Sequence, residues 1–202
     1  MSTNRKFNSV SPYMTTNLVT DVELEPYFMN NDLYGNLKKN LEDKLLNKSY
    51  KNYGYIINVI KINDFENNII PIEVLTGTAI YKLYFTCRLC TPMTDTVIIC
   101  KIDKITETFI TGKNGPITFF VNRDKINDKY FFFEKNNNLK YKNSNNVVQD
   151  VNVGQLVRIL IGCIEYRPSD IIIAGYLLSI STKDDISIYN NDILEFKTNK
   201  NM

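Results

Sequence analysis

The sequence predicts an α+β protein in which a small α+β domain is followed by a five-stranded β-barrel. Two features support this prediction. In the first half, one segment places its apolar residues four apart, as a helix does, and neighbouring segments alternate apolar and polar residues, as strands do. In the second half, five strand-like segments are separated by turn signals. A chain of 202 residues is long enough for two small domains, each with its own core.

The first domain is predicted to span residues 18–91, after a polar tail at residues 1–17. Residues 18–25 alternate apolar and acidic side chains, which indicates a half-buried strand. Asn31 and Asp32 then offer N-cap side chains for a helix in which the apolar residues lie four apart. These residues are Leu33, Leu37, Leu41 and Leu45.

After this helix, the sequence predicts three more strands. A turn around Tyr53 and Gly54 precedes a β-branched strand at residues 55–62. The polar residues 63–68 are predicted to form a loop, and residues 69–74 a further strand. The clearest pattern follows at residues 79–89, where every second residue is apolar, so that we expect a long strand with one buried face.

The second domain is predicted to span residues 92–182. Its five strands are expected at residues 96–103, 105–111, 116–121, 155–166 and 170–181, with turns at 112–115 and 167–170. The connection at residues 122–154 carries a polar run that predicts an exposed loop. Five short strands with one long connection are typical of a small Greek-key barrel of OB type. Residues 183–202 are expected to form a C-terminal tail or to add an edge strand.

The absence of His from the sequence excludes Ser-His-Asp and Cys-His nucleophiles and imidazole acid/base catalysis. Carboxylate pairs such as Glu23 and Glu25 fall on exposed strand faces. We therefore expect no catalytic residues, and no enzyme activity of the chain itself. Cys87 and Cys90 have C-x-x-C spacing, but residues three apart in a strand point to opposite faces, so we expect structural thiols, no metal site and no cofactor.

No stretch of about 18 apolar residues and no secretory signal occurs, so we expect an intracellular protein that does not contact a membrane. OB-type barrels commonly bind single-stranded nucleic acid on their second and third strands, through stacking and basic side chains. Phe119 and Phe120 are sequence neighbours in one strand, so only one of them can be exposed; the alternative is that the Phe residues are all core. The candidates in this region are Phe109, Lys113, Phe119, Phe120, Arg123 and Lys125.

A second aromatic cluster, at residues 129–133, is predicted to anchor the long loop or to form part of an interface. The formal net charge of +2 argues against high affinity for nucleic acid.

Several short motifs follow one another along the chain in a characteristic order. They are VELEP at residues 22–26, YGYI at 53–56, Gly77 followed by Tyr81 and Lys82, GPITFFV at 115–121, and DIIIAGYL at 170–177. Together with the order of the elements, they resemble the large stalk subunit of the multisubunit DNA-dependent RNA polymerases of archaea and eukaryotes, in the version carried by large cytoplasmic DNA viruses. The resemblance covers residues 18–180, most of the chain.

This resemblance implies a non-catalytic subunit whose first domain is a tip that docks on the large subunits of the polymerase core, near the clamp. The barrel is then expected to guide or weakly bind nascent RNA, and cellular members also bind a smaller stalk subunit. The expected localisation is the host cytoplasm and the virion. The alternative is a free-standing OB-fold protein that binds single-stranded nucleic acid. The resemblance assigns core docking to Tyr53 and Gly54, with the loop beside them formed by Asn63, Asp64, Phe65, Glu66, Asn67 and Asn68.

Overall fold

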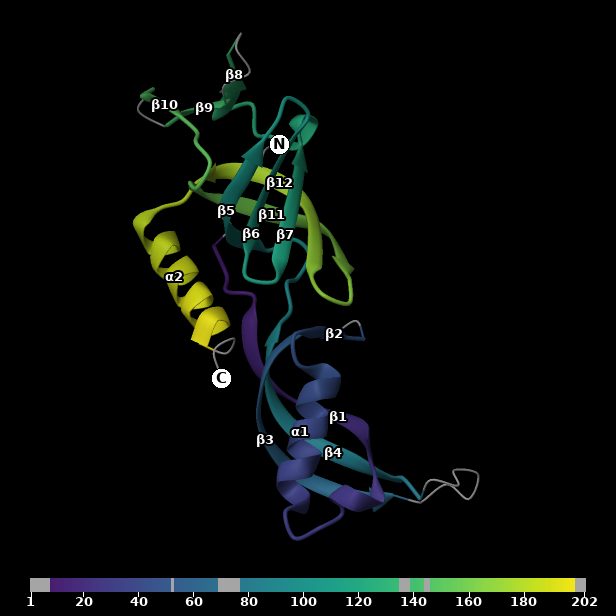
Figure 1. The fold of residues 1–202 in the computed structure, drawn as a ribbon. Helices are drawn as coiled ribbons and strands as arrows, with labels where there is room; N and C mark the ends of the chain where they lie inside the picture. Colours follow the sequence, from purple (N-terminus) through teal and green to yellow (C-terminus); the bar gives the residue numbers. More distant parts are fainter. Residues whose placement is uncertain (1–7, 52, 69–76, 135–138, 144–145, 199–202) are drawn as a thin grey trace. The chain divides into compact units, whose positions relative to one another are not determined.

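The structure is a computed structural model that describes residues 8–51, 53–68, 77–134, 139–143 and 146–198. The chain forms two units (Figure 1). We call Tyr13–Cys90 the sheet unit, and Met1–Pro12 together with Thr91–Met202 the barrel unit. The sheet unit combines a helix with an antiparallel sheet, and the barrel unit contains the closed barrel, so the predicted α+β class and OB-type barrel are confirmed.

The sheet unit contains a four-stranded sheet in the order β1-β4-β3-β2, in which all neighbouring strands are antiparallel. Helix α1 packs on one face of this sheet, and a 3-10 turn at Pro26–Phe28 precedes it. The elements are β1 (Tyr13–Leu24), α1 (Leu33–Leu45), β2 (Lys48–Tyr50), β3 (Gly54–Asn68) and β4 (Ala79–Cys90).

Helix α1 begins where the sequence predicts. The Asp32 carboxylate accepts a hydrogen bond from the backbone N–H of Gly35, which satisfies one of the free donors of the first turn. Leu37, Leu41 and Leu45 lie on one stripe of the helix and are buried against the sheet. In β4, buried and half-buried residues alternate along the strand, so the predicted long strand with one buried face is confirmed.

Strand β1 starts at Tyr13, so the prediction of a tail up to residue 17 is wrong for residues 13–17. Tyr13 pairs with Cys90, and the pairing with β4 continues without interruption to Leu24. The residues of this segment are polar because their face of the sheet is solvated: the Thr86 hydroxyl donates a hydrogen bond of 2.7 Å to the Asn17 side chain. A polar strand paired with an apolar one leaves no apolar alternation to detect.

Side chains from α1 and β2 cover the outer edge of β1. Three backbone carbonyls on that edge accept hydrogen bonds, which leaves the edge less available to a further strand. The pairs are Tyr50 to Val19 (2.8 Å), Lys44 to Asp21 (2.6 Å) and Asn40 to Glu23 (3.0 Å).

Strand β3 continues through the polar residues 63–68, so the prediction of a loop there is wrong. The register between β3 and β4 shifts three times, after Ile56, Val59 and Ile62, and each shift inserts one extra residue into β3. These same three residues are buried and lie three apart, so the two-residue alternation of a regular strand is lost. The strand predicted at residues 69–74 lies outside the described residues.

The barrel unit contains five strands that close in the order β11-β12-β7-β6-β5. Only β7 and β12 run parallel to each other; the other neighbouring pairs are antiparallel. The strands are β5 (Val97–Ile105), β6 (Phe109–Asn114), β7 (Ile117–Asn122), β11 (Leu156–Tyr166) and β12 (Ile171–Ile180). Residues 106–108, predicted as strand, form a turn in which the Thr106 hydroxyl donates to the Phe109 carbonyl at 2.7 Å.

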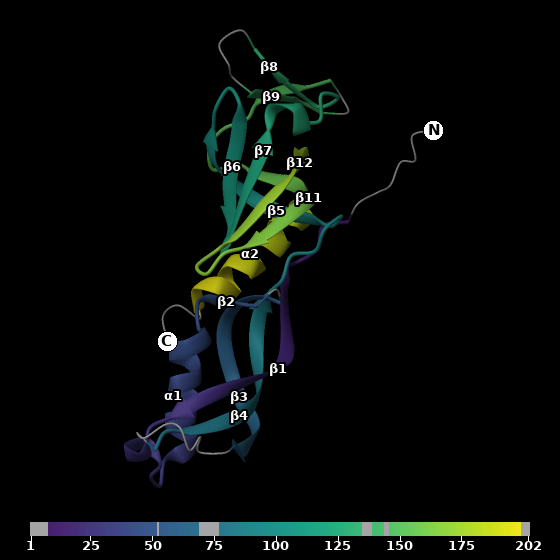
Figure 2. The same ribbon diagram turned by 90° about the vertical axis from the view of Figure 1, so that its right-hand side faces the viewer.

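The long connection between β7 and β11 is not simply an exposed loop. After a 3-10 turn at Arg123–Lys125 it forms a small sheet at one end of the barrel (Figure 2). Its strands are β8 (Phe131–Phe133), β9 (Leu139–Lys142) and β10 (Val148–Asp150). Phe131 is buried and its ring centroid lies 5.0 Å from that of Tyr141, so this residue of the second aromatic cluster packs within the connection.

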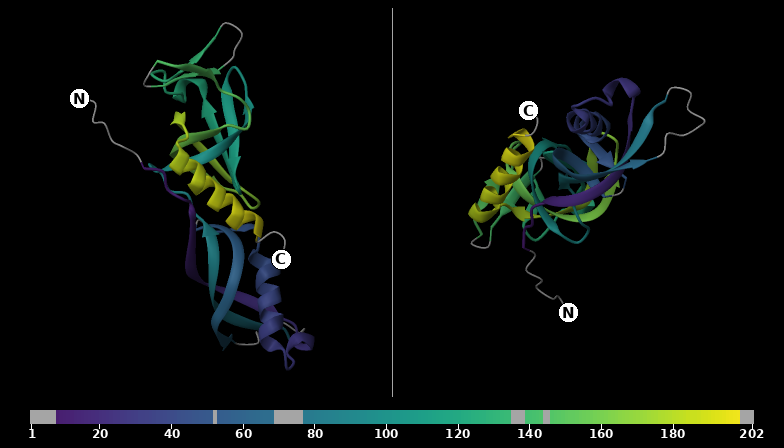
Figure 3. Two further views of the ribbon diagram at one scale, coloured as in Figure 1. Left: turned by 90° about the vertical axis from the view of Figure 1, so that its left-hand side faces the viewer. Right: turned by 90° about the horizontal axis from the view of Figure 1, so that it is seen from below.

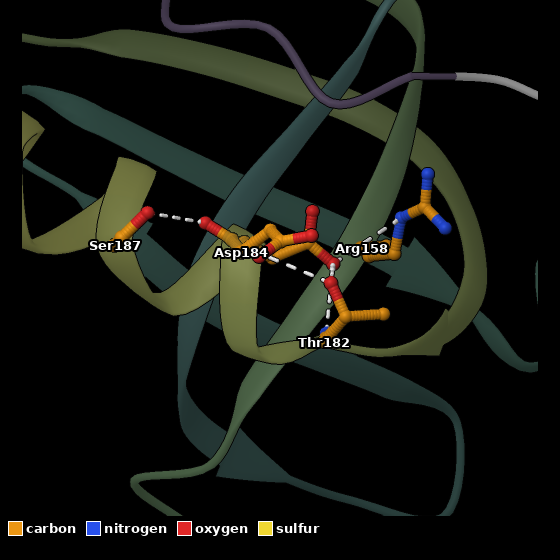
Figure 4. A network of polar contacts seen from close by, with 5 residues as sticks. Arg158, Thr182, Asp184 and Ser187 are labelled. Atoms are coloured by element: carbon orange, nitrogen blue, oxygen red, sulfur yellow. Dashed lines mark hydrogen bonds and ion pairs between the residues drawn. The ribbon is translucent and has the colours of Figure 1, made fainter.

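The predicted tail or edge strand at the C-terminus is instead a helix, α2 (Lys183–Thr198), which packs along β5 and β6 (Figure 3). The backbone N–H and hydroxyl of Thr182 each donate a hydrogen bond of 2.8 Å to the Asp185 carboxylate, and this pair caps the helix (Figure 4). Asp185 and Asp192 are buried at helical spacing. Because acidic residues occupy two of the buried positions of α2, the sequence shows no continuous apolar face for this helix. Within the part of the chain that the structure describes, no helix is long and apolar enough to cross a membrane.

Candidate nucleic-acid interface

Phe119 and Phe120, adjacent in β7, face opposite sides of the barrel wall. Phe119 is 0% exposed and fills the barrel core, so it cannot stack on a base, and its prediction as an RNA-binding residue is wrong. Gly112 lies opposite it in β6, where a Cβ atom would collide with the Phe119 ring and the Lys101 carbonyl. Phe120 points outward and is 40% exposed, as the alternation of a strand requires for its neighbour.

The outward face around Phe120 carries a second exposed aromatic ring. Phe120 pairs with Ala174 of β12, and Tyr176, two residues further along β12, lies on the same face and is 42% exposed. Gly162 and Gly175 join these rings in lining a groove of about 210 Å³. Gly162 is exposed, and a Cβ atom there would lie 3.5 Å from the Tyr176 ring, so the lack of a side chain keeps the groove open beside that ring.

Basic side chains lie against the aromatic rings of this region. The Lys125 ammonium is 5.1 Å from the centre of the Tyr176 ring, and the Arg123 guanidinium is 4.5 Å from the centre of the Phe133 ring. A cation over a ring is attracted by the negative face of the π system. Lys125 also lines the groove, and we call Phe120, Lys125 and Tyr176 the aromatic face.

Sequence reasoning missed Tyr176. It lies in the strand predicted at residues 170–181, in which Ile171, Ile173 and Leu177 are buried. The alternation of buried and exposed residues along that strand was the signal that could have identified it as outward-facing.

The other two predicted RNA-binding residues lie on β6. Phe109 is half-buried at the start of the strand. Lys113, near its end, is 3.9 Å from the Asp103 carboxylate and lines a different groove, beside α2. The structure therefore brings Phe120 and Lys125 together in one groove with Tyr176, and places Lys113 in another.

The residues to which the resemblance assigns docking do not form one patch. Tyr53 is exposed and its ring lies 6.1 Å from that of Tyr50, while Gly54 is buried at the first position of β3. Asn63 lies nine residues further along the same strand; because Tyr55 and Asp64 pair with Cys90 and Tyr84, six residues apart in β4, the separation is about 20 Å at about 3.3 Å per residue. The expectation that residues 63–68 lie beside Tyr53 and Gly54 is therefore wrong, because β3 is continuous between them.

The far end of β3 presents charged and aromatic side chains on an exposed surface. Glu66 accepts a hydrogen bond of 3.0 Å from the Tyr84 hydroxyl and lies 3.8 Å from the Lys82 ammonium. The interaction of the Lys82 ammonium with Tyr84, together with the negative charge of Glu66 nearby, raises the pKa of Lys82 above its usual value. Phe65 is partly exposed, with its ring edge-on to that of Tyr81 at 6.2 Å.

The cysteines are all free thiols. Cys87, Cys90 and Cys100 are buried, and Cys163 is exposed in the groove of the aromatic face. Burial raises the pKa of Cys87 to about 11, so this thiol stays protonated at neutral pH. Among the described residues, no three Cys, Asp or Glu side chains lie close enough to hold a metal ion.

Comparison with known proteins places the chain in a family. No family model matches it. A protein of Acanthamoeba polyphaga mimivirus that is named as a DNA-directed RNA polymerase subunit is 32% identical over 186 residues, which is 91% of this chain and 91% of the viral protein. A match of this length includes most of both units of the chain. The chain therefore belongs to the family of this viral DNA-directed RNA polymerase subunit.

Proposed function

We propose that the chain is a non-catalytic subunit that forms the stalk of a viral RNA polymerase, docks on the core through its sheet unit, and guides or weakly binds nascent RNA with its barrel. The observation that carries the proposal is the aromatic face, an exposed pair of rings with a lysine on an OB-type barrel of a polymerase subunit. Its place of action would be the host cytoplasm and the virion.

RNA binding by the aromatic face would depend mainly on stacking. Phe120 and Tyr176 offer two exposed rings, and stacking on an aromatic ring contributes about 1–3 kcal/mol per base. Arg123 and Lys125 supply two cations nearby. Two phosphate contacts on single-stranded RNA would give a slope of log K against log salt of about −1.4, so binding should be weak and should weaken further as salt rises.

Docking would use the exposed end of β3. Phe65 supplies apolar surface, and Glu66 and Lys82 supply charges of both signs that are already held in place by the contact with Tyr84. Such preformed polar contacts lower the cost of ordering side chains in an interface. The partners would be the large subunits of the core, with a smaller stalk subunit of the cellular kind as a further candidate. Tyr53 would contact a separate surface, because it lies at the other end of the strand.

Affinity purification of the tagged full-length chain from infected cells tests the docking role. The large polymerase subunits should co-purify with the wild type and with Tyr27→Ala, a control at an exposed aromatic residue, and should be lost with the double variant Phe65→Ala, Glu66→Lys. A free-standing nucleic-acid-binding protein would instead purify alone, and that result would refute the proposal.

Fluorescence anisotropy with a labelled single-stranded RNA tests the role of the barrel. Tyr176→Ala should weaken binding of the full-length chain about 5- to 150-fold at low salt, since it removes one of the two rings. Tyr27→Ala, which removes an equally large exposed ring elsewhere, should leave affinity unchanged. If Tyr176→Ala and Tyr27→Ala bound RNA with equal affinity, the RNA-binding role of the aromatic face would be refuted and only the docking role would remain.

A further inference from the structure

A second groove, of about 610 Å³, lies between the barrel and α2. Val153, Ile193 and Phe196 are among the apolar side chains that line it. Val153 is 62% exposed and adds aliphatic surface to the groove. The groove is separate from the aromatic face: the described residues that line the two have no member in common.

Three lysines border this groove: Lys101, Lys113 and Lys197. Lys101 and Lys113 are direct cross-strand partners in β5 and β6, and both are exposed on the same side of the sheet. Like charges directly opposite each other destabilise a pair of strands. Asp103 lies 3.9 Å from Lys113, and because these side chains are all well exposed, solvent screens both this ion pair and the Lys101–Lys113 repulsion. An anionic partner would relieve it.

The ends of the chain itself do not have the charge that this groove requires. Residues 1–7 contain Arg5 and Lys6, residues 199–202 contain Lys200, and neither segment contains an acidic residue. The side chains of these two segments add only positive charge, so neither segment complements the lysines of the groove.

RNA fits this groove less well than a protein segment does. Stacking of bases needs exposed rings, and the two aromatic residues here, Tyr189 and Phe196, are half-buried. The most exposed apolar surface is the aliphatic Val153, which has no stacking face. Aliphatic surface bordered by lysines is complementary to a peptide that carries both apolar and acidic side chains.

We propose that this groove binds an acidic, amphipathic segment of another polymerase subunit. The inference rests on the proposed function, since it takes the partner from the same complex. The apolar side chains of the segment would cover Val153 and Ile193, and its carboxylates would pair with the lysines at the border, neutralising the Lys101–Lys113 repulsion.

Site-specific photo-crosslinking in the purified complex tests the inference. A photoreactive amino acid replaces Val153 in the tagged full-length chain, and the matched control replaces Val147, which is 58% exposed outside the groove. After purification from infected cells and irradiation, mass spectrometry identifies the linked peptide. We expect position 153 to link to a segment of another subunit rich in Asp, Glu and apolar residues, with at least tenfold lower yield at position 147.

Charge reversal in the same experiment tests the lysines. Lys113→Glu with Lys197→Glu should lower the crosslink yield at position 153 about tenfold, because it places negative charge beside an acidic segment. Lys129→Glu with Lys142→Glu, exposed lysines outside the groove, makes the same change in net charge and should not lower it. A crosslink to RNA, to the chain's own ends or to nothing, in a preparation that still contains the large subunits, would overturn the inference and leave the proposed function intact. Loss of the large subunits from the wild-type preparation would instead contradict the proposed function.

Discussion

Replacing each of the neighbours Phe119 and Phe120 by Ala should give opposite results. Phe119 is 0% exposed inside the barrel, and Phe120 is 40% exposed on the aromatic face. The two substitutions remove the same side chain one residue apart in the same strand. We expect Phe119→Ala to lower stability and Phe120→Ala to lower RNA affinity.

The expected magnitudes follow from the two environments. Truncating a fully buried Phe costs about 3–5 kcal/mol, because the lost burial is joined by a cavity that the surrounding core cannot fill. Gly112, beneath the Phe119 ring, has no side chain to move into that space. Phe120 is only partly buried, so its truncation should cost about 1 kcal/mol of stability. It should lower RNA affinity by about 1–3 kcal/mol, or roughly 5- to 150-fold.

Urea unfolding followed by far-UV circular dichroism measures the first effect, since the chain has no Trp to report by fluorescence. Anisotropy of a labelled single-stranded RNA at low salt measures the second. The RNA affinities of Phe119→Ala and Phe120→Ala should be compared in buffer without urea, where both variants are folded. If Phe120→Ala lost as much stability as Phe119→Ala and kept its RNA affinity, the assignment of the two faces of β7 would be refuted.

Three further predictions concern α2 and the thiols. Asp192→Ala should cost about 2–3 kcal/mol of stability, since the buried Asn114 amide donates to this carboxylate at 3.2 Å, and the exposed Asp184→Ala is the control in urea unfolding. Burial alone would raise the pKa of Asp185, but hydrogen bonds from Thr182 and its other polar neighbours outweigh burial and lower the pKa. The stabilisation by Asp185 should therefore be complete above the unfolded pKa of about 4 and be lost as pH falls below it, and urea midpoints for Asp185→Asn between pH 3 and 7 should lack this loss. Cys163 should be the thiol that iodoacetamide modifies fastest in the folded chain, and saturating RNA should slow its modification, measured by mass spectrometry; unchanged rates would contradict the proposal that this groove binds RNA.

The elements that the sequence predicts well are those with an uninterrupted period. In α1 the buried leucines lie four apart, and in β4 the buried residues lie two apart, so composition and geometry agree. Strand β3 fails this test because three register shifts place Ile56, Val59 and Ile62, its residues in the core of the sheet unit, three apart instead of two. Helix α2 lacks such a period because Asp185 and Asp192 occupy buried positions where apolar residues are expected.

Strand alternation also made part of the candidate site predictable from the sequence. Strand alternation alone shows that only one of Phe119 and Phe120 is exposed, but the choice between them requires the register of β7 against β6 and β12. Tyr176 belongs to a strand far along the chain, and its place beside Phe120 depends on the parallel pairing of β7 with β12. Contacts between strands that are distant in sequence leave no mark in the local pattern.

The position of α2 explains why the predicted RNA-binding residues separate into two groups. An OB-type barrel commonly binds single strands on its second and third strands, here β6 and β7. Helix α2 packs on β5 and β6, so that Lys113 of β6 borders the groove beside the helix. Phe120 of β7 lies in the other groove, which continues onto β12 and β11 through Tyr176 and Gly162. Helix α2 thus leaves uncovered the groove on β7, β12 and β11, where we propose that RNA binds, and lines the separate groove where we propose that a protein segment binds.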